Sequence, residues 1–391
     1  MKRIIFCILI FLGNFYLLKA QTITVTSEAE VFISEGAAIY VSGSLLNNGT
    51  IENKKGTLAV SGDWTNNNTY SAEKDSLVFN GSERQNIFQN NMIVSSVIFD
   101  GGGEKFLLSE ISVLDEIVFK NGIVNTTENS LQISELAFVH GGSFQSFVEG
   151  ALIIEGGENR FFPIGKDGIY RPVALYNLRG NVPIIKMEAF NNSFSPSYEG
   201  NISYVYNNFY WKKTILSGSF TAANIEISYL PEDNIFDSEN LVVAQTEDLT
   251  QNFTNLGRSK KVNSSTIGFV TAIRNATATY FALSEGEALN TSPLFVPNAL
   301  SPFATNKEDR AIKVFGDVID EKAVFYFVVL NKWGNAVFET SSLEFMQTIG
   351  WQGKDQTTNE YLPAGNYEYR MIATTIAGES TTYKGVVLLV Q

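Results

Sequence analysis

The stretch VSGSLLNNGTI, residues 41–51, is followed nineteen residues later by VSGDWTNNNTY, residues 60–70. Val, Ser, Gly, two Asn and Thr recur in the same places, and Gly43, Gly62 and Gly81 share the same offset. A unit of this size cannot bury its own apolar side, so consecutive copies must stack to form a continuous core. We therefore expect a β-solenoid with these glycines at equivalent corners, where the backbone turns with positive φ. An ordinary β-sandwich with an accidental echo is the alternative.

The whole chain is predicted to be all-β. Short alternating runs bounded by Gly, Asn, Asp and Ser recur along it, and none keeps a sustained helical period. The N-terminal β-solenoid is expected over residues 21–155. Longer alternating runs, such as RPVALYNL and NFYWKKTIL, then predict a central antiparallel β-sandwich over residues 156–288. A polar linker at residues 289–293 leads into a third β-rich region, residues 294–391.

The first twenty residues, MKRIIFCILIFLGNFYLLKA, predict a cleaved signal peptide. Lys2 and Arg3 precede an apolar run, and Ala20 offers a small residue for cleavage before Gln21. A membrane anchor is the competing interpretation, but the apolar run is short for spanning a bilayer. We expect a mature chain without a membrane span. The single Cys lies in this segment, so the exported protein must fold without disulfides.

Charge and composition argue against several classes of partner. The formal net charge of −13 is unfavourable for binding nucleic acid or an anionic membrane surface. One His, together with no Cys outside the signal segment, cannot supply the usual ligand set of a structural zinc site. No phosphate-binding loop is present. We expect no metal and no cofactor.

The residues that could carry out catalysis are few. Only His140 could act as a histidine base, and a structural or surface role is more common for a single His. Some β-solenoids cleave polysaccharides with paired carboxylates, but Asp63, Asp75 and Glu116 do not follow the nineteen-residue spacing. We expect no catalytic residues and no enzymatic activity. The alternative is a polysaccharide-processing enzyme on a β-helix scaffold, which a carboxylate pair on adjacent turns would favour.

Aromatic side chains could bind a glycan by stacking on its sugar rings. The candidates are Trp64, Tyr70, Trp211 and the tyrosine cluster ISYVYNNFYW, residues 202–211. Aromatic residues in alternating strands are more often part of the core.

The third region contains short motifs in a defined order, from FVPNALSP through LNKWGNAVFET, GWQGKD and YLPAGNYEYRM to YKGVVLLVQ. Apolar runs flank Gly334 and predict a hairpin there. Trp333 and Trp351 are expected as large apolar anchors of a small core. The motif residues are Pro297, Asn298, Asn331, Lys332, Trp333, Gly334, Trp351, Gly353, Leu362, Pro363, Gly365, Tyr367 and Gly385.

In this order the motifs resemble the gliding-motility-associated C-terminal domain, the type B sorting domain of the Bacteroidetes type IX secretion system. The resemblance covers residues 294–391 and implies an Ig-like β-sandwich that serves as a secretion signal for the type IX machinery. One element departs from the family. An Asn-Gly-Asp-Gly-x-Asn-Asp loop usually follows the entry strand, and here residues 303–315 read FATNKEDRAIKVF.

The N-terminal arrangement is also similar, more distantly, to Bacteroidetes surface proteins with Gly-Asn solenoid turns and an FPIGK…YRPV segment. The resemblances imply a non-enzymatic protein exported through the periplasm to the cell surface or the medium. An adhesin-like role in contact with glycan or extracellular matrix is then expected.

Overall fold

The computed structural model describes residues 22–90, 93–287, 294–316, 324–374 and 380–390. The expected signal peptide with its Ala20–Gln21 cleavage site and the expected linker at 289–293 lie outside these residues. Strands account for 55% of the structure and helices for 5%, which confirms the all-β prediction. By contacts, residues up to 132 with 137–147 form one compact unit, and 133–136 with 148–391 form the other.

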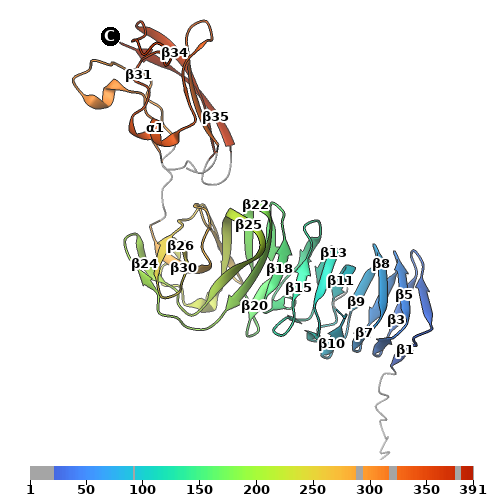
Figure 1. The fold of residues 1–391 in the computed structure, drawn as a ribbon. Helices are drawn as coiled ribbons and strands as arrows, with labels where there is room; N and C mark the ends of the chain where they lie inside the picture. The colour runs from blue at the N-terminus through green and yellow to red at the C-terminus, as the bar shows by residue number, and fades with distance from the viewer. Residues whose placement is uncertain (1–21, 91–92, 288–293, 317–323, 375–379, 391) are drawn as a thin grey trace, which may run out of the picture. The chain divides into compact units, whose positions relative to one another are not determined.

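The N-terminal part is a parallel β-solenoid of about seven turns, drawn from blue to green in Figure 1. Three parallel sheets form its walls, in the orders β1-β4-β7-β10-β12-β14, β3-β6-β9-β11-β13-β16 and β2-β5-β8. The strands are β1 (Ile23–Val25), β2 (Glu30–Ile33), β3 (Ala38–Val41), β4 (Leu45–Asn47), β5 (Thr50–Lys54), β6 (Thr57–Val60), β7 (Trp64–Asn66), β8 (Thr69–Glu73), β9 (Ser76–Phe79), β10 (Gln85–Phe88), β11 (Ile93–Phe99), β12 (Lys105–Leu107), β13 (Ile111–Phe119), β14 (Val124–Asn125), β15 (Leu131–Ile133) and β16 (Phe138–Gly141).

The recurring glycines lie where the backbones of successive turns of the solenoid approach closely. The Gly62 amide donates to the Gly43 carbonyl at 2.8 Å, and a Cβ on Gly62 would lie 2.5 Å from the Gly43 carbonyl carbon. A Cβ on Gly81 would meet a backbone oxygen of the preceding turn at 2.3 Å. Neither Gly62 nor Gly81 has a positive φ, so the expected reason for glycine was wrong. Close backbone approach, rather than a left-handed turn, requires glycine here.

Matching side chains stack along the solenoid interior. Phe79, Phe99 and Phe119 form a ladder with successive ring centroids 5.9 Å apart. The buried Asn47 donates its amide to the Asn66 side chain at 2.7 Å. These ladders satisfy buried polar groups and pack rings between neighbouring turns, so each turn depends on the next for its core.

One buried carboxylate makes the solenoid sensitive to pH. Asp75 is 1% exposed and accepts hydrogen bonds from the Tyr70 hydroxyl and, at 3.3 Å, from the Asn53 amide. Burial raises the pKa of Asp75 from 3.8 to about 6. Because the folded pKa is the higher one, the stabilisation is complete below about pH 4 and is lost as the pH rises through 6.

We expect Asp75→Asn to stabilise the solenoid at neutral pH by up to about 3 kcal/mol, since one pKa unit corresponds to about 1.4 kcal/mol. The amide keeps an acceptor for the Tyr70 hydroxyl but carries no charge. Hydrogen exchange of peptides spanning residues 50–79 at about pH 5 and about pH 7 measures the effect. Glu35→Gln is the control, because that side chain is 76% exposed. Equal protection of wild type and Asp75→Asn at pH 7 would contradict the expectation.

The central part of the chain is built mainly from antiparallel strand pairs around two very long strands. Its strands are β17 (Val148–Glu149), β18 (Leu152–Glu155), β19 (Arg160–Phe162), β20 (Ile164–Lys166), β21 (Ile169–Tyr170), β22 (Val173–Phe190), β23 (Ser197–Tyr198), β24 (Ile202–Val205), β25 (Tyr210–Tyr229), β26 (Leu241–Thr246), β27 (Asn252–Asn255), β28 (Lys260–Val262), β29 (Gly268–Thr271) and β30 (Tyr280–Gly286), with short 3₁₀ helices η1 (Pro231–Asp233) and η2 (Ser238–Asn240).

Strands β22 and β25 pair along their length, with several register shifts. The sequence predicts four shorter strands here, separated by turns. The structure instead has bulges at these places, with positive φ at Gly180, Val182 and Gly218, so the two strands bend without ending.

The FPIGK…YRPV segment brings a buried ion pair into this core. The Arg171 guanidinium donates to both carboxylate oxygens of Asp233, at 2.6 and 2.7 Å, and lies 3.9 Å from the Phe209 ring centroid. The Trp211 indole donates to the Arg171 carbonyl at 2.9 Å. Arg171 therefore joins η1 to the aromatic core beneath β25, and a structural role accounts for its environment.

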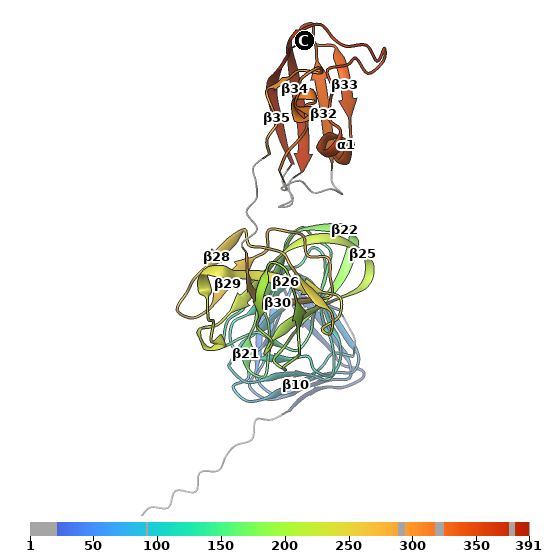
Figure 2. The same ribbon diagram turned by 90° about the vertical axis from the view of Figure 1, so that its left-hand side faces the viewer.

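The C-terminal part has a five-stranded sheet in the order β31-β35-β34-β32-β33, and Figure 2 shows the four longer strands side by side. Its elements are β31 (Ala299–Leu300), η3 (Lys307–Arg310), β32 (Phe325–Leu330), β33 (Ala336–Thr340), α1 (Leu343–Thr348), β34 (Gly365–Thr374) and β35 (Ser380–Leu389). The second layer consists of α1 and of extended segments joined by isolated bridges, such as Phe295–Phe315 and Ile312–Trp351. Leu343 and Met346 of α1 belong to the shared core.

Candidate recognition site in the C-terminal domain

The hairpin between β32 and β33 has a tightly organised turn. The Asn331 side-chain oxygen accepts from the amides of Trp333 and Asn335, each at 3.0 Å. The Gly334 amide donates to the Asn331 carbonyl at 2.9 Å, and Gly334 has a φ of 81°. The turn therefore requires both Asn331 and Gly334: one for its side-chain acceptor and the other for its left-handed backbone.

Trp333 lies at the tip of this turn and is 73% exposed. The prediction that it anchors the core was wrong. Trp333 lies in the turn beyond the end of β32. The apolar residues on either side of the turn therefore do not determine where its side chain points. The Lys332 ammonium lies 4.5 Å from the Trp333 ring centroid and covers part of the indole. The hairpin thus presents an aromatic ring and a cation together on a constrained turn.

Trp351 is buried in the core, as the sequence predicted for both tryptophans. It is 1% exposed, and its indole donates to the Lys354 carbonyl at 2.9 Å. Its ring meets Tyr367 edge-on with centroids 5.6 Å apart, and the Tyr367 hydroxyl donates to the Pro363 carbonyl at 2.9 Å. Trp351, Pro363 and Tyr367 hence form one packed and hydrogen-bonded unit.

Other motif residues also have structural roles. Gly353 has a φ of 75°, and a Cβ there would lie 2.8 Å from the Leu389 side chain. Its carbonyl accepts from the Leu362 amide at 2.9 Å. A Cβ on Gly385 would lie 2.5 Å from the Tyr369 ring. These glycines make room for neighbouring side chains.

The entry segment is tied to the last strand. The Asn298 carbonyl accepts from the Leu388 amide at 2.8 Å, next to the half-buried Pro297. Gly365 begins β34 with a φ of 155° and nothing within 4 Å of its added Cβ. Lys332 and Trp333 are adjacent motif residues, and both present exposed side chains on the turn.

The departing loop at residues 303–315 has its own stabilising contacts. Asn306 caps η3 by accepting from the Glu308 amide at 3.2 Å, and Arg310 donates to the Ala304 carbonyl at 2.6 Å. The Arg310 guanidinium therefore hydrogen-bonds a backbone carbonyl within the same loop. Among the described residues, no group of three or more His, Cys, Asp or Glu could hold a metal ion.

A polysaccharide-processing enzyme on this scaffold would need two accessible carboxylates on adjacent turns of the solenoid. The Ser95 hydroxyl in β11 donates to Asp115 on the neighbouring strand β13. Asp75 is buried, so a substrate cannot reach it from solvent. Glu116 lies 3.4 Å from the exposed His140 on the neighbouring strand. Neither arrangement pairs two accessible carboxylates on adjacent turns.

Three of the aromatic residues proposed to contact glycans are buried. Trp64 and Trp211 are 0% exposed and Tyr70 is 4% exposed, so these three candidates belong to the core and are not available to stack on a sugar. Within the tyrosine cluster, Tyr206 and Tyr210 are buried and Tyr204 is half-buried.

Within the described residues, no helix is long and apolar enough to cross a membrane. Comparison of the chain with protein-family models, curated proteins and solved structures finds no match.

Proposed function

We propose that this chain is a non-enzymatic protein exported by the type IX secretion pathway to the cell surface or the medium. Its C-terminal domain is the secretion signal, and the solenoid and central part are the exported cargo with an adhesin-like or matrix-contacting role. The exposed Lys332–Trp333 pair is the observation that carries the proposal. Within the sorting-domain motif, the fold accounts for the buried Trp351 but leaves the Trp333 ring in solvent.

The tip has the properties of a recognition element. An exposed Trp ring can contribute strongly to binding when a partner covers it, and constrained turns lose little entropy on binding. Asn331 and Gly334 hold the turn in one conformation before any partner arrives. A receptor in the export machinery could therefore read the indole and the ammonium as one unit.

Trp333→Ala is expected to reduce export several-fold while the C-terminal domain stays folded, because the ring contributes to binding and not to the core. The measurement is the ratio of surface-plus-medium to periplasmic protein in cells producing the full chain. Phe303→Ala provides a matched control, since that ring lies in the same domain and is 64% exposed. Export of Trp333→Ala at the wild-type ratio would remove the hairpin tip from the signal.

A further inference from the structure

We infer that the central part carries a binding site for a neutral polysaccharide, formed by the rings of Tyr204 and Phe236 and an adjoining polar hollow. Biologically, this inference rests on the proposed function, since a surface location would bring the site to extracellular glycan. Its chemistry is independent of export. Phe236 precedes η2, and Tyr204 lies in β24, which pairs with β30.

Three aromatic rings meet at this place. Phe236 is 74% exposed and stands edge-on to Tyr204, with ring centroids 5.4 Å apart. The buried Tyr206 lies under both, with centroids 5.1 Å from Tyr204 and 6.0 Å from Phe236. A lone exposed phenylalanine is ordinary on a protein surface. Here the exposed ring is supported by two others, which together form an apolar platform.

The loop that carries Phe236 is held in place by hydrogen bonds to buried side chains. The Phe236 amide donates to the Tyr206 hydroxyl at 2.8 Å, and the Asp237 amide donates to Glu285 at 2.9 Å. Tyr206 in turn donates to the same carboxylate of Glu285. Two backbone amides next to the ring are thereby held by groups that are themselves buried.

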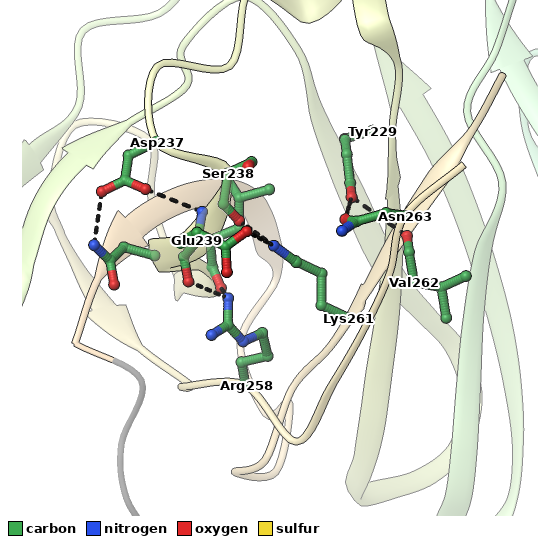
Figure 3. A network of polar contacts seen from close by, with 10 residues as sticks. Tyr229, Asp237, Ser238, Glu239, Arg258, Lys261, Val262 and Asn263 are labelled. Carbon is green, nitrogen blue, oxygen red and sulfur yellow. Dashed lines mark hydrogen bonds and ion pairs between the residues drawn. The ribbon is translucent and has the colours of Figure 1, made fainter. Parts of the chain in front are cut away.

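Two basic side chains contact the residues that follow in the same loop, as Figure 3 shows. Arg258 donates to the carbonyls of Glu239 and Leu241, at 2.8 and 3.0 Å, and Lys261 donates to the Ser238 carbonyl at 2.6 Å. Both cations thus satisfy carbonyl oxygens of η2. A ring presented on a loop with so many contacts loses little conformational entropy when a ligand covers it.

An open hollow of about 400 Å³ adjoins the platform, within the size range of small-ligand sites, roughly 300–1,000 Å³. Four of its seven lining residues have polar side chains: the lining consists of Gly200, Asn201, Ile202, Ser203, Asn240, Gly286 and Glu287. Asn240 connects the hollow to the platform, because its amide donates to Asp237 at 2.6 Å, next to Phe236. Ser203 precedes Tyr204 in β24.

The aromatic rings and the polar groups of the hollow match the apolar and polar surfaces of a sugar. The C–H face of a pyranose can stack on an aromatic ring, and its hydroxyls can bond amide, hydroxyl and carboxylate groups. Asp237 and Glu287 at the rim would repel an anionic sugar. The ligand class is therefore a neutral glycan rather than a polyuronate.

The test is calorimetric titration of the purified full chain with cellohexaose, xylohexaose, laminarihexaose and chitohexaose, and with hexagalacturonate as the anionic comparison. We expect at least one neutral hexasaccharide to bind, and hexagalacturonate to bind at least tenfold more weakly. Phe236→Ala should weaken the neutral binding at least tenfold, and Asn240→Ala several-fold. Phe138→Ala, which removes a ring that is 68% exposed on the solenoid, should leave binding unchanged.

Failure of all four neutral sugars to bind would overturn the inference, as would wild-type affinity in Phe236→Ala or equal affinity for hexagalacturonate. Both variants replace exposed residues, so an unchanged thermal unfolding profile is expected and serves as the folding check. Because the titration uses purified protein, a failed export experiment would leave its result intact, and the two proposals can fail separately.

Discussion

Trp351→Ala is expected to destabilise the C-terminal domain by about 3–5 kcal/mol, the usual cost of truncating a fully buried aromatic residue. The side chain is 1% exposed, packs edge-on against Tyr367 and donates to a backbone carbonyl. Its loss would leave both a cavity and an unpaired acceptor. Since small domains are stable by only about 5–15 kcal/mol, this loss removes much of that margin and raises the population of locally unfolded molecules. Hydrogen exchange of the full chain over residues 325–373 measures this domain apart from the others.

Trp333→Ala is the matched control, because it removes the same kind of ring from an exposed position in the same domain. We expect its free energy of unfolding to stay within about 0.5 kcal/mol of wild type, as is usual for exposed positions without a structural role. Comparing the two substitutions therefore distinguishes a tryptophan that stabilises the domain from one that is exposed on its surface. Comparable destabilisation by the two substitutions would show that the tip packs against the domain in solution.

The solenoid could be predicted because its signal is repeated. The nineteen-residue offset between residues 41–51 and 60–70 reports stacking directly, since equivalent positions must face the same neighbours. The physical reason for the glycines could not be read in the same way. A glycine required by backbone contact and one required by positive φ look alike in sequence, and Gly62 proved to be the first kind.

The site residues were harder to predict, because the burial of a ring depends on partners distant in sequence. Trp333 and Trp351 both lie beside turns, and only the fold distinguishes the displayed ring from the packed one. Phe236 was missed altogether, since a single Phe in PEDNIFDSEN has no periodic signal. Its support comes from Tyr206 and Glu285, which lie far along the chain.

Deletion of residues 294–391 is expected to abolish passage across the outer membrane while leaving inner-membrane export intact. The N-terminal signal that we propose would govern only the first step, so the shortened chain should accumulate in the periplasm with that signal removed. The remaining residues include the solenoid and the central strands, whose cores are built from their own side chains. The truncated protein should therefore be folded, and its retention would reflect the missing signal rather than degradation.

The most direct measurement is the fraction of this protein found on the surface and in the medium, for the full chain and for the deletion in the same cells. Periplasmic protein of each form is quantified alongside, and protease protection in intact cells separates surface from periplasm. We expect the full chain to be mainly outside the cell envelope and the deletion to be almost wholly in the periplasm. Normal surface or medium abundance of the deletion would contradict the assignment of the C-terminal domain as the secretion signal.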